Sequence, residues 1–179
     1  MELLENDLIK LRAPELSDLE LLYAWENDTE VWPASNTLAP FSKHVLRKYL
    51  DNAHEDIYQA KQLRLMIDIK GEDGISYKTI GAIDLFNFDP FHHRAGLGVL
   101  IGRKELRGKG FASQALKLVI DYAFGWLGLH QLYCNISHDN TISLKLFKTH
   151  GFEVIGEKKD WVYDGEKWHS EYLLQLINE

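Results

Sequence analysis

The chain has little of several residue types that mark particular protein classes. Its 179 residues contain a single cysteine, Cys134, which rules out a disulfide within the chain and hence the class of disulfide-stabilised scaffolds. No apolar run approaches the roughly 20 residues that span a bilayer. The first residues include Glu2, Glu5 and Asp7 and lack the apolar segment of a secretory signal. We therefore expect a cytoplasmic protein with no membrane partner.

Positive charge is also in deficit. Lysine and arginine number 20 against 27 acids, a formal net charge of −7. Nucleic-acid-binding domains usually present a broad basic surface, so this balance argues against such a partner and favours cationic ones. Apolar residues make up 45% of the chain, enough for a full core. The length predicts one domain over residues 1–179.

One basic, glycine-rich stretch, Arg107–Ser113, stands apart from this acidic background. A short apolar strand precedes it at 97–102, and apolar residues at helical spacing follow from Phe111 to Trp126. A glycine turn between a strand and a helix N-terminus presents free N–H groups, so the stretch predicts an anion site. Neither the P-loop string nor the dinucleotide fingerprint fits, because Ser113 stands where the latter needs its third glycine.

The remaining patterns predict the order β-α-α-β-β-β-α-β-α-β-β, an α+β fold. A capping box at Ser17 and Glu20 predicts the start of the first helix, and Asp164-Gly165 predicts a hairpin. The expected strands cover 8–12, 63–70, 79–88, 94–102, 132–137, 152–163 and 167–176, and the expected helices cover 17–27, 42–61, 111–126 and 140–149.

Three motifs in order carry a family resemblance. Arg107, Gly110 and Ala112 fill the pattern [QR]-x-x-G-x-[GA], Asn140-Thr-Ile-Ser143 follows, and Lys148-Thr-His-Gly151-Phe152 closes the region. Together with the run His92-His-Arg-Ala95, the chain resembles the GNAT N-acetyltransferases. It is most similar to the subgroup that contains ribosomal-protein N-terminal acetyltransferases and spermidine acetyltransferases.

The resemblance implies a GNAT fold, with a mixed, mostly antiparallel sheet of about seven strands flanked by about four helices. It also implies acetyl-CoA as co-substrate, bound without a metal. The central strand would separate from the fifth strand and hold the pantetheine arm through its free backbone groups. The implied acetyl-CoA residues are Val99, Leu100 and Ile101 on the strand, Arg107, Gly108, Lys109, Gly110, Phe111, Ala112 and Ser113 around the diphosphate, and Asn140 on the pantetheine. Lys145 and Lys148 stand where they could reach the nucleotide end, although a solvated helix face explains them equally well.

Two positions depart from the family pattern. Many relatives have a tyrosine as thiol proton donor where this chain has Phe147, and many have a glutamate on the central strand where it has Gly96. Ser143 matches a serine assigned as the acid in some relatives. It is therefore the candidate catalytic residue, but it could equally be a first-turn residue that bonds the backbone.

The favoured function is direct transfer of acetyl from acetyl-CoA to a primary amine, on a polyamine-like molecule or a protein N-terminus. A catalytically silent acyl-CoA-binding module and an aminoglycoside-modifying enzyme remain open as alternatives, as does assembly into a homo-oligomer. Asp84, Asp89 and Asp160 lie at strand ends where they could meet a cationic amine. Five aromatic residues could line a substrate mouth, but aromatic side chains in such segments are more often in the core: Trp25, Trp32, Trp161, Tyr163 and Trp168.

Overall fold

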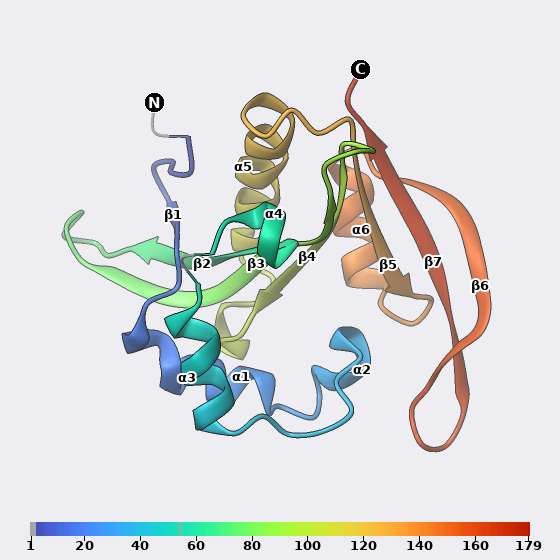
Figure 1. Ribbon diagram of the computed structural model, residues 1–179, viewed down its shortest axis with the longest axis horizontal. Helices are drawn as coiled ribbons and strands as arrows, with labels where there is room; N and C mark the ends of the chain where they lie inside the picture. Colours follow the sequence, from blue (N-terminus) through green and yellow to red (C-terminus); the bar gives the residue numbers. More distant parts are fainter. Residues whose placement is uncertain (1–2, 54) are drawn as a thin grey trace.

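A computed structural model describes residues 3–53 and 55–179. One seven-stranded sheet has the order β1-β2-β3-β4-β5-β7-β6, and only the contact between β4 and β5 is parallel. The predicted α+β architecture, with its mixed and mostly antiparallel sheet, is therefore confirmed (Figure 1). The strands are β1 (Ile9–Arg12), β2 (Gln62–Lys70), β3 (Tyr77–Asp89), β4 (Arg94–Ile101), β5 (Gln131–Ser137), β6 (Glu153–Tyr163) and β7 (Trp168–Ile177).

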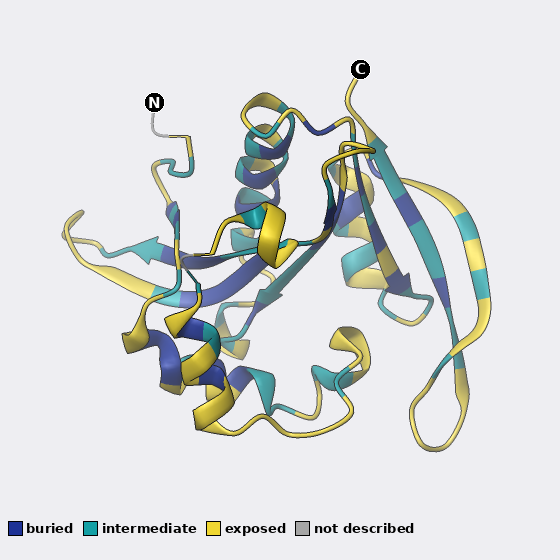
Figure 2. Ribbon diagram, in the orientation of Figure 1, coloured by how far each residue is buried: buried dark blue, intermediate teal, exposed yellow. Residues whose placement is uncertain are grey.

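Helices cover both faces of the sheet. On one face, α5 (Phe111–Gly125) and α6 (Thr141–Thr149) pack over a core that includes Leu97, Leu116 and Phe147. On the other face, α1 (Leu19–Glu26) and α3 (Lys43–Asp51) bury a second cluster around Met66 and Ala82. Figure 2 shows buried segments on the inner sides of these helices and in the central strands. We call these the α5 face and the α1 face.

The helix expected over 42–61 is broken into two. Ser42 does cap α3, because its hydroxyl accepts a hydrogen bond from the Val45 N–H, but the helix ends at Asp51. The chain resumes helical structure only in α4 (Ile57–Ala60), which Asp56 caps. The apolar spacing in 42–61 predicts that Val45, Leu46 and Leu50 all face inward. Leu46 and Leu50 are buried, but Val45 is 49% exposed. The apolar pattern stops at Leu50, so nothing beyond it holds the helix to the core. Position 54 lies outside the described residues.

The expected capping box at Ser17 and Glu20 is wrong. A 3-10 turn, η1 (Leu16–Asp18), precedes α1, and the carboxylate of Asp18 accepts a hydrogen bond from the Glu15 N–H at 2.8 Å. Asp18 also binds Arg12, so a cap formed by Glu15 and Asp18 and an ion pair to β1 together set the start of this helical segment. A second short helix, α2 (Trp32–Ser35), lies between the helices expected over 17–27 and 42–61, where no helix was predicted.

The hairpin β6–β7 forms one end of the sheet and extends away from the helices in Figure 1. Its aromatic residues are not in the core as expected. Trp161, Tyr163 and Trp168 are each more than half exposed, since this end of the hairpin has no helix packed over it. Among the described residues, no helix combines the length and apolar character needed to cross a membrane.

Candidate active site

The glycine stretch forms the turn from η2 (Lys104–Leu106) into α5. Gly108 and Gly110 have φ of +74° and +87°, in the region that favours glycine, and a Cβ at either would meet no atom within 4 Å. Gly110 is the N-cap of α5, and its carbonyl accepts the first intrahelical bond, from the Gln114 N–H. The three preceding N–H groups, on residues 111–113, therefore have no partner within the helix. Such N–H groups at a helix start can bind an anion, which is the role that the sequence predicted for this turn.

The cations near this turn are engaged in different ways. Arg107 Nε donates to the Ile101 carbonyl at 2.9 Å, which ties the turn to the end of β4. Arg103 Nε donates to the Thr79 carbonyl, and Lys104 lies 2.6 Å from a Glu30 oxygen. Among the described residues, only Lys104 of these three cations is paired with acids, so Arg103 and Arg107 keep their full charge, which adds to the attraction of the backbone N–H groups for an anion.

Strands β4 and β5 separate beside this turn. They pair at only three positions, from Arg94–Gln131 to Gly96–Tyr133, whereas β4 stays paired with β3 as far as Ile101. The separation is the V between β4 and β5 in Figure 1. We call it the β4–β5 gap, and it matches the separation that the resemblance implied.

Backbone alternation decides which groups of β4 face the gap. The Gly102 N–H donates to the Ile80 carbonyl at 2.9 Å, so even-numbered residues of β4 exchange bonds with β3. Val99 and Ile101 therefore turn their N–H and C=O groups toward the gap. Leu100, expected to offer free backbone groups there, is paired with β3 instead.

Helix α6 lies along the far side of the gap. Asn140 caps it, with its Oδ1 accepting from the Ser143 N–H at 3.1 Å, and Gly151 ends it with φ of +88°, both as predicted. Within the described part of the chain no partner is found for the Ser143 hydroxyl. Phe147 is buried, with its ring edge-on to Phe152. The helix start is thus capped by Asn140, and the Ser143 hydroxyl is not used to stabilise it.

An open groove of about 520 Å³ runs along α6. Its lining is made by Thr141, Leu144, Lys145, Lys148 and Thr149. Both lysines expected near the nucleotide end therefore border the same surface.

A side-chain contact joins α5 and α6, the two helices of the α5 face. Ser113 Oγ lies 2.8 Å from His150 Nε2, which connects the first turn of α5 to the end of α6. Burial, with a smaller effect from Lys117, lowers the pKa of His150 below its usual value, so the ring is neutral at pH 7. Nothing in the sequence pattern pointed to His150.

Across β4, the α1 face carries an ion cluster. Arg64 donates to both oxygens of Asp84 at 2.7 and 3.0 Å and to Glu26 at 2.5 Å, and its guanidinium lies 5.7 Å from the centre of the Tyr49 ring. Burial acts to lower the pKa of Arg64, but Asp84 and Glu26 outweigh it and hold that pKa above its ordinary value. Burial raises the pKa of Tyr49. We call Glu26, Arg64 and Asp84 the Arg64 cluster.

The Arg64 cluster borders a bare part of β4. Asp84 is the Cα partner of Gly98, which is partly exposed and offers no side chain. At Gly96 a Cβ would lie 2.2 Å from the Phe86 ring, and that ring also meets Tyr133 edge-on at 6.3 Å. The place where many relatives have a glutamate is therefore covered by an aromatic ring. Phe86, Tyr133 and Arg64 were not among the residues that the sequence singled out.

The other candidate groups have ordinary surroundings. Asp89 bonds the His92 N–H and pairs with Arg94, and Asp160 lies in an irregular part of β6 with φ of +48°. Cys134 is buried as expected, and burial raises the pKa of its thiol to about 12. Within residues 3–53 and 55–179, no group of three His, Cys, Asp or Glu side chains is arranged to hold a metal ion.

The chain is similar to known N-acetyltransferases in both sequence and fold. The model of the acetyltransferase (GNAT) domain matches residues 9–153. The uncharacterized N-acetyltransferase p20 of Bacillus licheniformis is 30% identical over 178 residues, covering 99% of this chain and 97% of that protein. The spermidine N(1)-acetyltransferase of Escherichia coli (strain K12) is 29% identical over 152 residues, covering 83% of this chain and 75% of its own length.

A solved structure agrees on the fold. The spermidine N-acetyltransferase from Vibrio cholerae, in complex with CoA and spermine, superimposes with a TM-score of 0.84 at 21% identity, covering 96% of each chain. The family model covers the glycine turn, both strands of the gap and α6. The chain belongs to the GNAT acetyltransferase family and is an N-acetyltransferase that uses acetyl-CoA as its co-substrate.

Proposed function

We propose that this enzyme acetylates a primary amine of a polyamine-like, multiply cationic small molecule. The observation that carries the proposal is the Arg64 cluster beside Gly98, at the strand that borders the β4–β5 gap. Two carboxylates share one guanidinium there, and each remains 20% exposed. An ammonium group is attracted by such exposed negative charge, and the acidic chain as a whole adds long-range attraction. Relatives named spermidine acetyltransferases support the same class of acceptor.

The proposed acetyl-CoA site lies on the α5 face of the sheet, on the opposite side from the Arg64 cluster. We assign its diphosphate to the N–H groups of residues 111–113 and its pantetheine arm to the backbone of Val99 and Ile101 and to Asn140. When bound there, acetyl-CoA supplies an acetyl group activated as a thioester. The N–H of Val99 faces the gap, where it is placed to donate to a carbonyl oxygen that gains negative charge during attack.

Attack requires a neutral amine. A lysine-like amine with a pKa of about 10.4 is mostly protonated at pH 7, and deprotonation then costs about 4.6 kcal/mol. We expect kcat/KM to rise from pH 6 to pH 8.5 for this reason. A thiol with a pKa near 8.5 leaves with only about 2 kcal/mol of further cost at pH 7, so a proton donor for sulfur helps without being indispensable.

We assign that donor role to Ser143, whose hydroxyl is not needed for the helix cap. Ser143→Ala should lower kcat roughly 10- to 100-fold and leave acetyl-CoA affinity nearly unchanged, since the hydroxyl acts mainly in the transition state. Thiol-release kinetics measure kcat, and calorimetry on the same sample measures the affinity for acetyl-CoA. Because Asn140 provides the cap, the melting temperature should stay within about 2 °C. An unchanged kcat would remove Ser143 from the mechanism.

The acetyl-CoA assignment has its own test. Gly110→Asp places a residue with a Cβ at a φ of +87°, a region that favours glycine, and its carboxylate puts negative charge at the anion site. Affinity for CoA should fall by well over a factor of about 10, equivalent to more than about 1.4 kcal/mol. Lys109→Ala, which leaves the backbone unchanged, should cost less and lose its effect at high salt. Normal CoA binding by Gly110→Asp in calorimetry would show that the diphosphate lies elsewhere.

A further inference from the structure

The contact between Ser113 and His150 joins two elements that the proposed function places around one ligand. Ser113 is the third residue of α5, at the anion site, and His150 is the C-cap residue of α6, directly after the helix that borders the groove. Their side chains meet at 2.8 Å in a partly buried position, across 37 residues of chain. Sequence-local geometry does not create this contact, so it depends on how α5 and α6 pack.

The direction of this hydrogen bond matters for an anion. A neutral imidazole either accepts from the Ser113 hydroxyl or donates to it, depending on which nitrogen holds the proton. If His150 accepts, the hydroxyl proton of Ser113 is donated to the ring, and only the lone pairs of Ser113 Oγ face the anion. If His150 Nε2–H donates to Ser113 Oγ, the serine proton is free to point at a phosphate oxygen. An anion at the α5 N-terminus therefore favours the second arrangement.

We propose that His150 is a positioning residue for acetyl-CoA. It donates through Nε2 to Ser113 and thereby aims the serine hydroxyl at the diphosphate. The same bond holds the end of α6 against the start of α5, so that the diphosphate site and the Lys145–Lys148 groove keep a fixed separation. This inference rests on the proposed diphosphate site at residues 111–113.

The test is a double-mutant cycle on CoA binding, measured by calorimetry on the full chain. Ser113→Ala and His150→Leu should each weaken CoA binding by roughly fivefold to tenfold, the usual effect of losing one ordinary hydrogen bond. The double variant should be no weaker than about tenfold, because both substitutions remove the same chain of hydrogen bonds. His150→Gln, whose amide can replace Nε2–H, should recover most of the affinity.

Two further readouts separate positioning from a general structural effect. The KM for acetyl-CoA should rise in His150→Leu, while the acceptor KM and kcat at saturating acetyl-CoA stay unchanged. His44→Leu, at an exposed position on α3, is the matched control and should bind CoA normally. If His150→Leu does not fold, His150→Gln and His150→Asn decide the matter, because the asparagine amide is too short to reach Ser113.

The outcomes are distinguishable from those of the proposed function. Normal affinity in His150→Leu with loss of binding in Gly110→Asp would overturn the role of His150 and leave the diphosphate site standing. Additive losses near 100-fold in the double variant would show that the two residues act separately, which also overturns it. Normal binding in Gly110→Asp would overturn both assignments together.

Discussion

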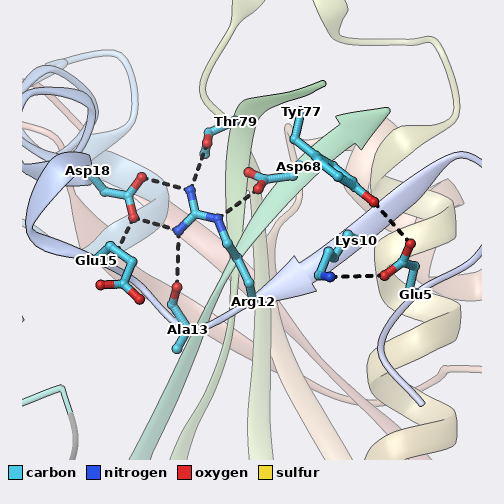
Figure 3. A network of polar contacts seen from close by, with 9 residues as sticks. All are labelled: Glu5, Lys10, Arg12, Ala13, Glu15, Asp18, Asp68, Tyr77 and Thr79. Atoms are coloured by element: carbon cyan, nitrogen blue, oxygen red, sulfur yellow. Dashed lines mark hydrogen bonds and ion pairs between the residues drawn. The ribbon is translucent and has the colours of Figure 1, made fainter. Parts of the chain in front are cut away.

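Helix α1 is held to the sheet at both ends by an arginine between two carboxylates, yet the two ends differ in what can reach them. At its start, Arg12 binds Asp18 and Asp68 (Figure 3). At its end, Arg64 binds Glu26 and Asp84. Each cluster has two acids and one base, a net charge of −1. We call the first one the Arg12 cluster.

Exposure separates the two clusters. In the Arg12 cluster the carboxylates are 4% and 6% exposed, and Thr79 and the Ala13 carbonyl bind the rest of the guanidinium. In the Arg64 cluster both carboxylates are 20% exposed, and the neighbouring strand position is a glycine, Gly98. The same chemistry thus serves to attach β1 to α1 at one end and leaves negative charge accessible at the other. Burial of the acids, rather than ion-pair composition, distinguishes a structural cluster from a candidate binding site.

The largest effect is expected from removing Arg12, the cation that pairs with two buried carboxylates. Arg12→Leu leaves Asp18 and Asp68 buried without their cation, which should reduce the free energy of unfolding by about 3–5 kcal/mol. Urea denaturation measures this loss. Arg47→Leu, at an exposed position on α3, should change it by no more than about 0.5 kcal/mol. A fall in kcat in the folded Arg12→Leu variant would contradict a purely structural role, because the Arg12 cluster would then contribute to catalysis.

A smaller but more specific effect is expected at the other end of the helix. Glu26→Gln keeps a hydrogen-bond acceptor for Arg64 but removes one negative charge. The KM for a triamine should rise about tenfold, and the effect should shrink at high salt, while the acetyl-CoA KM stays constant. Asp18→Asn removes the same charge from the Arg12 cluster and is the matched control. An equal change in triamine KM in both variants would mean that overall charge, not the site, attracts the acceptor.

The smallest effect is expected at an ion cluster that can titrate. His169 on β7 bridges Asp164 in the hairpin turn and Asp139 before α6, and hydrogen bonds first to Asp164 and then to Asp139 raise its pKa above the ordinary value. A raised pKa stabilises the folded state fully below the unfolded value near 6.5, and this contribution is lost as pH rises through the folded pKa.

We therefore expect amide exchange in the β6–β7 turn, corrected for its intrinsic pH dependence, to accelerate as pH rises from 6.5 through the raised pKa. His169→Gln should remove this dependence without changing exchange in β2. Arg12 and Arg64 keep their charge over the same range. Equal pH dependence in β2 and the hairpin would show that His169 is not the group responsible.

Much of the acetyl-CoA side could be predicted because its signals are local. The turn at Gly108 and Gly110, the Asn140 cap and the terminating Gly151 each depend on residues within a few positions along the chain, and all three lie where the pattern indicated. The prediction that Leu100 offers free backbone groups to the gap was wrong. A sequence motif does not reveal which backbone groups of β4 are already paired with β3.

The acceptor side could not be predicted to the same extent, because its contacts join distant segments. Arg64 and Asp84 are 20 residues apart and meet through the register of β2 and β3, and Glu26 reaches them only once α1 is placed. Phe86 covers Gly96 through the register of β3 and β4. None of these pairings has a signature within a short stretch of sequence.

We propose that the partly exposed carboxylates of Glu26, at the end of α1, and Asp84, on β3, select a multiply cationic amine. The most direct measurement is thiol release from acetyl-CoA with spermidine, a matched monoamine, a peptide with a free N-terminus and an aminoglycoside. We expect kcat/KM for spermidine to be at least about tenfold above that for the monoamine, with the difference largely lost in Glu26→Gln. Preference for the peptide or the aminoglycoside, or acetyl-CoA that binds without thiol release for any amine, would contradict it.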